Sequence, residues 1–258
     1  MVNHAIILAA GLGQRLRARS ASKPLTQVHS LSLIEIGVRQ LHAAGIAHIV
    51  VVTGHEADRV EAHIDALADR LDLDLRCVRL EDWSRPNGWS VIAGAGAVDA
   101  PFVLVMADHM FGDGLLARLA GQSLDQCDVV LATDRVDNPL VDPDDATWAA
   151  RDDQARITAI GKHIAPYDAV DCGAFLANVA LPRAIERAIA QGAAGSLSDG
   201  MQVLADARRA MTMDIAGAWW LDVDDPRALD LALDQAPDHL DCVRRAAMAD
   251  GGGGGDVG

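Results

Sequence analysis

The residues best suited to chemistry lie in a glycine-rich stretch near the N-terminus. Gly11 and Gly13 follow the apolar run Ala5-Ile6-Ile7-Leu8, and Arg15 and Lys23 come soon after them. Glycine has no Cβ, so two such residues let backbone N–H groups approach an anion closely. The Arg guanidinium adds a planar fork of donors for phosphate oxygens, and the Lys ammonium adds a mobile point charge. This combination predicts a cradle for a polyphosphate.

The spacing of this stretch separates it from two other phosphate-binding loops. The dinucleotide fingerprint G-x-G-x-x-G requires a third glycine where this chain has Leu16, which disfavours an NAD-linked oxidoreductase. The P-loop pattern G-x-x-x-x-G-K-[ST] does not occur in the sequence. What remains is G-x-G-x-R, followed at a distance by Lys23-Pro24-Leu25. A bare glycine pair is typical of any tight turn between a strand and a helix, but the two added cations favour a binding site.

Carboxylates follow two other apolar runs. Asp108 comes directly after the run over residues 102–107, and Asp222 and Asp224 follow a Trp-Trp-Leu run. The carboxyl ends of parallel strands meet at the sheet edge where ligands bind, and residues at alternate positions of a strand share a face. Carboxylate oxygens are the ligands that Mg²⁺ prefers. We therefore expect a magnesium site at Asp108, Asp222 and Asp224, although an acid after a strand also commonly caps a helix.

Two polar stretches have simpler interpretations. Asn87-Gly88-Trp89-Ser90 is typical of a turn with an N-cap that opens a helix through Val91 and Ala95. The acidic run Asp142-Pro143-Asp144-Asp145 is interpreted as a solvated loop and not as a metal site.

Strand and helix patterns alternate along the chain. Short apolar runs rich in β-branched residues predict buried strands over 5–8, 49–53, 75–78, 102–107 and 129–133. Helical periodicity appears between them, over 33–41 and around 59–67, and a hairpin is expected over 146–160. This alternation predicts an α/β fold, a single Rossmann-like domain with a mostly parallel mixed sheet flanked by helices.

Length and composition limit the classes of function. A chain of 258 residues suffices for one large domain with a substantial core. The formal net charge of −15 repels nucleic acid backbones, so no nucleic acid partner is expected. The apolar runs are of strand length and no signal-like segment precedes Ala5, which predicts a cytoplasmic protein without a membrane span. We expect the domain to cover residues 1–236 and residues 237–258 to form a Gly-rich, disordered tail.

The motifs resemble those of a known enzyme superfamily. Leu8-Ala-Ala-Gly-Leu-Gly-Gln-Arg15 with Lys23-Pro24-Leu25 resembles the signature of nucleotidyltransferases that join NTPs to sugar phosphates and alcohol phosphates. Further blocks are similar to the CTP:inositol-1-phosphate cytidylyltransferases, and they include Gly161-Lys162, Tyr167 through Gly173 and Leu197 through Gly200. The resemblance implies transfer of CMP from CTP to inositol-1-phosphate with release of pyrophosphate and with Mg²⁺ as the cofactor.

The resemblance also assigns roles to individual residues. It implies nucleotide contacts from Leu8, Ala9, Ala10, Gly11, Gly13, Arg15, Lys23, Asn87, Gly88 and Ser90. Acceptor contacts would come from Lys162, Asp171 and Trp220, Mg²⁺ would bind Asp108, Asp222 and Asp224, and catalysis would depend on Arg15, Lys23, Asp108 and Lys162. Phosphocholine, a phosphonate or a hexose-1-phosphate remain alternative acceptors, as does a base other than cytosine. A nucleotide-sensing module without turnover is the alternative outside the enzymes.

Overall fold

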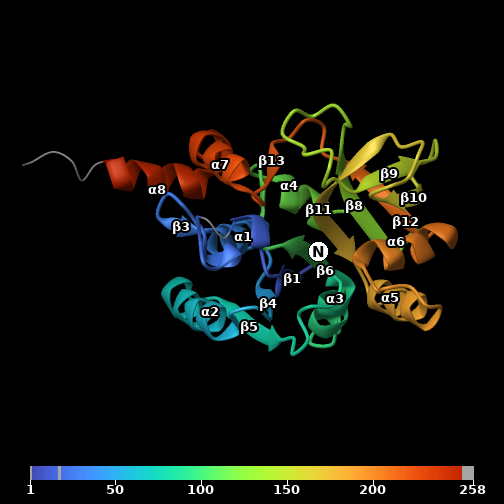
Figure 1. Ribbon diagram of the computed structural model, residues 1–258, viewed down its shortest axis with the longest axis horizontal. Coiled ribbons are helices and arrows are strands. Elements are labelled where there is room, and N and C mark those ends of the chain that lie inside the picture. Colours follow the sequence, from blue (N-terminus) through green and yellow to red (C-terminus); the bar gives the residue numbers. More distant parts are fainter. Residues whose placement is uncertain (1, 17–18, 252–258) are drawn as a thin grey trace, which may run out of the picture.

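The computed structural model describes residues 2–16 and 19–251, which form three layers with a sheet between two sets of helices (Figure 1). Within the described residues nine strands form the main sheet, in the order β10-β9-β11-β6-β1-β4-β5, with β8 paired to β11 and β12 paired to β8. The strands are β1 (His4–Ala9), β4 (His48–Thr53), β5 (Asp74–Arg79), β6 (Phe102–Met106), β8 (Val129–Asp134), β9 (Trp148–Arg151), β10 (Ile157–Gly161), β11 (Ala169–Ala177) and β12 (Ala210–Asp214). The fold class predicted from the sequence is confirmed.

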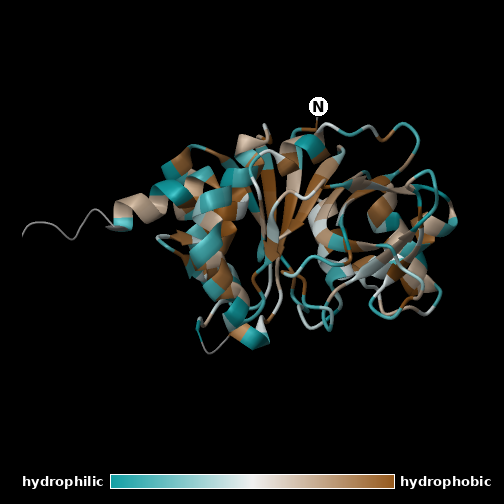
Figure 2. Cartoon of the chain, turned by 90° about the horizontal axis from the view of Figure 1, so that it is seen from above, coloured by the Kyte–Doolittle hydropathy of each residue, from teal (hydrophilic) through white to brown (hydrophobic). Residues whose placement is uncertain are grey.

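The parallel half of the sheet centres on β1. This strand lies between β4 and β6 and is parallel to both, so that Ile6 is aligned with Val50 on one side and with Leu104 on the other. Strand β11 then runs antiparallel to β6, β8 and β9. The central strands are buried on both faces, which is why their sequences are continuous apolar runs (brown in Figure 2). The C-terminal ends of β1 and β6 therefore meet at one edge of the sheet.

The helices divide between the two faces of the sheet. They are α1 (Leu33–Ala43), α2 (Ala57–Leu71), α3 (Asn87–Ala95), α4 (Leu115–Ala120), α5 (Ala180–Ala190), α6 (Leu197–Asp206), α7 (Pro226–His239) and α8 (Asp241–Gly251), with short 3₁₀ turns at Gln14–Leu16 and Lys23–Leu25. Ile7 of β1 belongs to the core shared with α1, α2 and α4, whereas Ile6 belongs to the core shared with α3, α5 and α6. Alternate residues of one strand thus anchor opposite helix layers.

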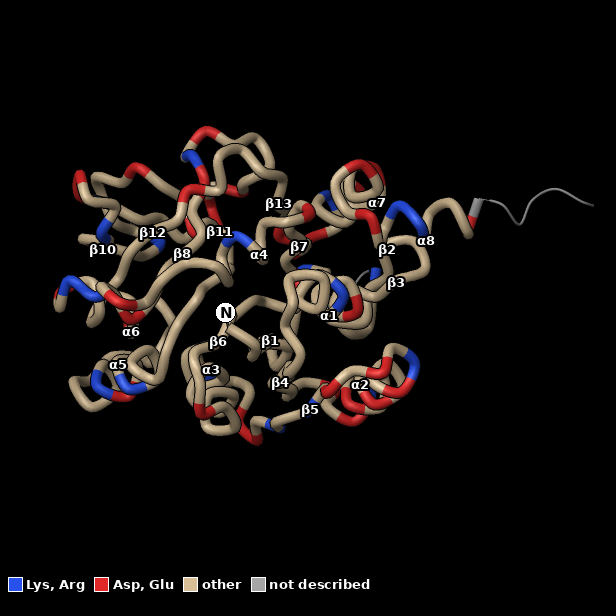
Figure 3. Tube along the Cα trace, turned by 180° about the vertical axis from the view of Figure 1, so that it is seen from behind, with Lys and Arg blue, Asp and Glu red and all other residues tan. Residues whose placement is uncertain are grey.

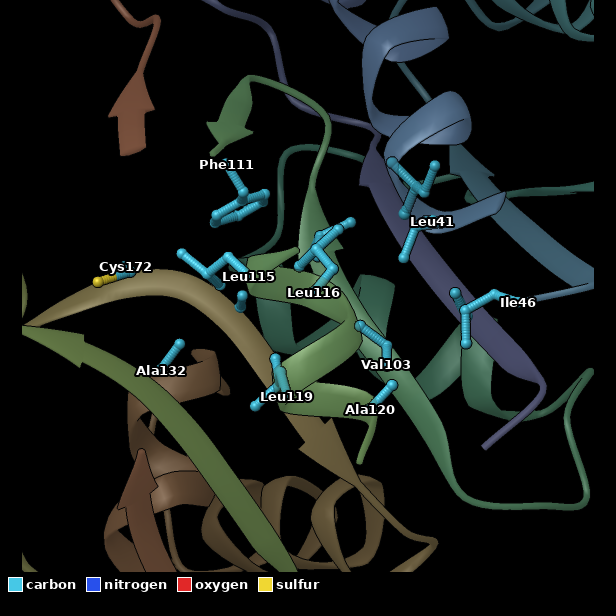
Figure 4. Close-up of a cluster of buried hydrophobic side chains, with 14 of the residues drawn as sticks. Leu41, Ile46, Val103, Phe111, Leu115, Leu116, Leu119, Ala120, Ala132 and Cys172 are labelled. Atoms are coloured by element: carbon cyan, nitrogen blue, oxygen red, sulfur yellow. The ribbon is translucent and has the colours of Figure 1, made fainter. Parts of the chain in front are cut away.

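Helix α4 shows how tightly one of these layers is held. Leu115, Leu116 and Leu119 are buried against the sheet, close to Val103 of β6 and Phe111 (Figure 4). Phe111 belongs to β7 (His109–Phe111), which pairs antiparallel with β13 (Trp220–Asp222). A second small sheet joins β2 (Gln27–Val28) to β3 (Leu31–Ser32). This packing fixes β7, and with it the segment that immediately follows Asp108.

The C-terminal helices extend the folded unit beyond the expected boundary. Helix α7 continues through position 236, and α8 follows it at one end of the molecule (Figure 1). Leu240, Val243 and Ala246 are buried in a third apolar cluster with β13 and the segment around β2 and β3. The expected disordered tail from residue 237 is therefore wrong for residues 237–251, because an apolar stripe on α8 finds a partner that local composition does not reveal. Residues 252–258 lie outside the described residues.

Most of the acidic residues lie away from the sheet edge. Figure 3 shows them as red segments, several of them on α2 and α7. Many are paired with arginines, as in the contacts of Arg79 with Asp58 and Glu61. Within the described residues no helix is both long enough and apolar enough to cross a bilayer.

Candidate functional site

The glycine-rich loop forms one wall of a cavity at the C-terminal end of β1. We call this the loop cavity, and its wall consists of Leu8, Ala9, Gly11, Gly13, Gln14, Arg15, Lys23, Pro24, Ala107, Asp108, Asp145 and Asp224. Gly13 has a φ of +58°, and a Cβ there would lie 2.5 Å from Cβ of Lys23. Glycine is therefore required at this position for Lys23 to approach the loop. Ala10 is buried, and its carbonyl oxygen accepts a hydrogen bond from the backbone N–H of His55.

Lys23 lies at the centre of the charged groups. Its ammonium contacts the carboxylates of Asp108 and Asp224, and its side chain is only 10% exposed. Burial alone would raise the pKa of Asp108, but the charge of Lys23 and the hydrogen bond from His109 outweigh it and hold that pKa well below its usual range. Arg15 also contacts Asp224. The cations and acids predicted from distant parts of the sequence thus meet at one point.

His109 joins the two strand-end acids. Its Nδ1 lies 2.9 Å from Oδ1 of Asp108 and 3.7 Å from Oδ1 of Asp222. The pairing of β7 with β13 sets Asp222 opposite His109, and the backbone N–H of Val223 donates to the carbonyl oxygen of Asp108. Burial favours the neutral imidazole, but the charge of Asp222 and the bond to Asp108 prevail and raise the pKa of His109 to about 9. No role was predicted for His109 from the sequence, although its position next to Asp108 is a usable signal.

The acids have the composition of a divalent cation site. Ligand atoms of Asp108, His109 and Asp222 lie within 4.8 Å of one another, and so do those of Asp145, Asp222 and Asp224. Oδ1 of Asp222 is buried and has no hydrogen-bond partner among the described residues. Burial and the charge of Asp108 raise the pKa of Asp222, against the opposing charge of His109. A hard cation would supply this oxygen with a partner, so the residues fit the expected Mg²⁺.

A second cavity adjoins the loop cavity, and we call it the Trp220 cavity. Its wall includes Asn87, His109, Leu140, Asp142, Asp145, Lys162, Asp171, Ser198, Trp220, Asp222, Asp224 and Arg227. Lys162 follows β10, and its ammonium contacts the carboxylate of Asp145. Arg15, Asp145 and Asp224 line both cavities. Most of the predicted nucleotide residues line the loop cavity and the predicted acceptor residues line the Trp220 cavity, and the two cavities share a boundary.

Asp145 corrects the interpretation of its acidic turn as a solvated loop. Its carboxylate contacts both Arg15 and Lys162, and it is only partly exposed. Burial alone would raise the pKa of Asp145, but the hydrogen bond from Lys162 and the charge of Arg15 lower it. The turn lies between β8 and β9, and only the tertiary fold brings it to the glycine-rich loop. The neighbouring Asp144 is exposed, as expected.

Asp171 and Trp220 both reach the Trp220 cavity. Strand β11 is irregular between Asp171 and Phe175, and the backbone N–H of Gly173 donates to Oδ1 of Asp171 at 2.7 Å. Burial raises the pKa of Asp171 to about 6 against that hydrogen bond. The indole N–H of Trp220 donates to Asp134, and its ring lies 6.1 Å from that of His109.

Of the three residues of α3 that were predicted to contact the nucleotide, Asn87 and Gly88 also have structural roles. Asn87, Gly88 and Ser90 form the first turn of α3, whereas a turn ahead of the helix was expected. Oδ1 of Asn87 accepts a hydrogen bond from the backbone N–H of Leu197, at the start of α6. A Cβ on Gly88 would lie 2.3 Å from the carbonyl oxygen of Gly195. Of the three, Asn87 lines the Trp220 cavity, while Gly88 and Ser90 are buried and line neither cavity.

Residues 5–160 match the model of the MobA-like NTP transferase domain. The chain belongs to this family. The matched segment contains the glycine-rich loop, Asp108 and Asp145, but it ends before Lys162 and Asp222. The recognition of a nucleotidyltransferase from its motifs is thereby confirmed.

Two relatives match most of this chain. The chain is 37% identical over 234 residues to a "Bifunctional IPC transferase and DIPP synthase" of Rubrobacter xylanophilus and 26% identical over 235 residues to a protein of the same name from Aquifex aeolicus. These matches cover 88% and 90% of this chain but only 50% and 51% of the relatives, so the chain spans about half their length.

Solved structures share the fold. The inositol-1-phosphate CTP transferase of T. maritima superposes with a TM-score of 0.78 at 22% identity, over 91% of this chain and 97% of that one. A UDP-glucose pyrophosphorylase complexed with UDP-glucose superposes with a TM-score of 0.77 at 15% identity, over 92% and 99% of the two chains.

Proposed function

We propose that this chain transfers CMP from CTP to inositol-1-phosphate with Mg²⁺ as cofactor and releases pyrophosphate. The observation that carries the proposal is the shared boundary of the two cavities, at Arg15, Asp145 and Asp224. A nucleotide triphosphate in the loop cavity and an acceptor phosphate in the Trp220 cavity would meet there. The names of the 37% identical relative and of the T. maritima structure support the choice of CTP and of an inositol phosphate.

In this proposal the glycine-rich loop and its cations hold the nucleotide. Backbone N–H groups around Gly11 and Gly13, with the side chains of Arg15 and Lys23, bind the triphosphate. Asp108 and Asp222, with Asp224, would hold Mg²⁺, which when bound neutralises phosphate charge and orients the phosphoryl group. Leu8, Ala9 and Asn87 line the cavities beside these groups.

Lys162 binds the phosphate of the acceptor and directs it towards the α-phosphorus of the nucleotide. A phosphate monoester is already an anion at neutral pH, so the attack requires no general base and no covalent enzyme intermediate. Catalysis is then mostly positioning and charge neutralisation. Pyrophosphate leaves in line, next to Arg15 and Lys23.

The aromatic residues favour a polyol acceptor over a quaternary ammonium. A choline group is bound best in a cage of several aromatic faces. The rings of Trp219 and Trp220 are used separately, since Trp219 stacks on His239 and Trp220 lies beside His109. The carboxylates of Asp142 and Asp171 on the same wall are acceptors for hydroxyl groups.

The deciding experiment is a pyrophosphate-release assay with Mg²⁺. Each NTP is paired with inositol-1-phosphate, phosphocholine and glucose-1-phosphate. We expect release with CTP plus inositol-1-phosphate and none with the other pairs. Release with a different pair would keep the nucleotidyltransferase and reject the proposed substrates, and no release with any pair would favour a nucleotide sensor.

A further inference from the structure

The wall of the Trp220 cavity carries three basic side chains of the arginine and lysine type, and two of them are already paired. Arg15 contacts Asp145 and Asp224, and Lys162 contacts Asp145. The third is Arg227, which is exposed. Across residues 2–16 and 19–251 its guanidinium has no ion-pair or hydrogen-bond partner. It is thus the one cation on the described wall that can bind an anion without breaking an existing contact.

The position of Arg227 is set by the start of α7. Asp225 caps the helix by accepting a hydrogen bond from the backbone N–H of Ala228 at 2.7 Å, and Pro226 occupies the first helical position. Ala228 and Leu231 line the same cavity as Arg227. The first turns of a rigid helix therefore form this part of the wall, and the N-terminal end of a helix is favourable for a bound anion.

Acidic side chains outnumber basic ones on this wall, which favours an unpaired cation as the binding group for an anionic ligand. Six aspartates line the cavity, whereas only the three basic residues named above do so. The aspartates are Asp142, Asp145, Asp171, Asp222, Asp224 and Asp225. A phosphate that binds Lys162 must compete with the carboxylate of Asp145 for its ammonium. At Arg227 there is no such competition.

We propose that Arg227, together with Lys162, binds the phosphate group of the acceptor and so selects phosphorylated acceptors. This inference rests on the proposed function. A guanidinium suits the role because its planar fork can donate two parallel hydrogen bonds to phosphate oxygens. Arg227 is a substrate-binding residue in this assignment and takes no part in metal binding.

The test measures steady-state kinetics of the wild type, Arg227→Ala and Arg227→Lys with CTP, Mg²⁺ and inositol-1-phosphate. Arg227→Ala should raise the KM for inositol-1-phosphate roughly 10- to 100-fold, because a hydrogen-bonded charge pair is lost. The KM for CTP should stay unchanged. Arg227→Lys keeps the charge without the fork, so it should recover part of the loss. Arg187→Ala removes an exposed arginine of α5 that has no partner among the described residues, so it is the matched control and should behave as the wild type.

Inhibition by unphosphorylated myo-inositol separates phosphate recognition from a general change of the cavity. Its inhibition constant should be the same for wild type and Arg227→Ala, since it has no group for Arg227 to bind. An active Arg227→Ala enzyme with an unchanged KM for inositol-1-phosphate overturns the inference and leaves the proposed function intact. A rise in the KM for CTP alone overturns it too, because it places Arg227 on the nucleotide. A wild type that releases no pyrophosphate with any acceptor overturns the proposed function and the inference with it.

Discussion

Lys23 and Asp108 form an ion pair at the C-terminal edge of the sheet, although one lies in the glycine-rich loop and the other follows β6. The pair is largely shielded from water, so each charge depends on the other for its stability. A bound triphosphate and its cation would replace this ion pair, because the phosphate would bind Lys23 and the cation would bind Asp108.

Replacing Asp108 by Asn should lower turnover by at least ~10², the effect typical of losing one preorganised electrostatic contact. The amide keeps the size of the side chain but removes the charge that would bind the metal. The measurement is the rate of pyrophosphate release at saturating substrates. Asp137→Asn is the control, because Asp137 is exposed and pairs only with Arg135 among the described residues. Near-normal turnover of Asp108→Asn would reject the metal assignment.

Replacing Asp145 by Asn should lower kcat by about tenfold without raising the KM for CTP. The carboxylate holds Arg15 and Lys162 in place, so its loss disorders both, but it also competes with phosphates for the same cations. In binding, the disorder of the two cations and the loss of their competitor oppose each other, so the KM for CTP should not rise. The disorder still lowers kcat, because the cations no longer hold the phosphates in position. Steady-state kinetics can separate them, with Asp144→Asn from the same turn as the control. A loss confined to KM would show that Asp145 serves substrate binding alone.

Replacing Gly173 by Ala should lower both stability and turnover. The residue has a φ of +75°, and a Cβ would lie 2.4 Å from Cδ2 of His109, so the imidazole that joins Asp108 to Asp222 must move. Gly192→Ala is a matched control, because Gly192 also has a positive φ, of +95°, but faces open space. Both variants should lose about 1 kcal/mol or more from backbone strain. Only Gly173→Ala should also lose activity, and equal activity in the two variants would refute the role given to His109.

Replacing Asp171 by Asn should stabilise the ligand-free protein at neutral pH. The folded state raises the pKa of Asp171 from 3.8 to about 6, so folding favours the protonated acid. The contribution of Asp171 to the unfolding free energy of the wild type should therefore be greatest below about pH 4 and fall as the pH rises towards 6. Asn removes this dependence and should gain about 1 kcal/mol above pH 6. Thermal unfolding from pH 4 to 8 measures the difference, with Asp144→Asn to account for the loss of one charge; a gain that does not vary with pH would contradict the explanation.

Replacing Leu240 by Ala should cost about 2–5 kcal/mol of unfolding free energy, as for other large-to-small changes in a core. Leu240 is fully buried between α7 and α8, and it lies beyond the domain boundary expected from the sequence. Met248→Ala on the exposed side of α8 is the control and should change little. Chemical denaturation of both variants gives the comparison. A neutral Leu240→Ala would mean that the last two helices are not part of the cooperative unit.

The parts of the fold that the sequence predicts are those with strong local causes. Strand β4 was expected because a run of β-branched residues fits a strand buried on both faces, and α1 because its apolar residues recur at helical spacing. Asp108 could be placed at the ligand edge since the end of a parallel strand has a fixed location. These inferences require no knowledge of the contacts between distant segments of the chain.

The missed features depend on contacts between distant segments. Asp145 has the sequence environment of a surface turn, and only the path of the chain after β8 brings it to Arg15 and Lys162. Asn87 was predicted to contact the nucleotide, but the hydrogen bond that its acceptor oxygen receives at the start of α6 was not foreseen. Helix α8 has a weakly apolar sequence, and its apolar residues can be recognised as buried only when α7 is packed against them. No local pattern encodes such partners.

Strand β11 has a consequence for how the chain folds during synthesis. It is the strand that pairs with β6, β8 and β9, and it lies beyond the segment that matches the family model. A nascent chain that ends at residue 160 therefore contains β6 with one edge satisfied by β1 and the other edge bare. Bare edges of apolar strands invite pairing with other chains. Fragments cut at the end of the family match should aggregate on the ribosome or after release, and the shortest fragment that folds must include residue 177.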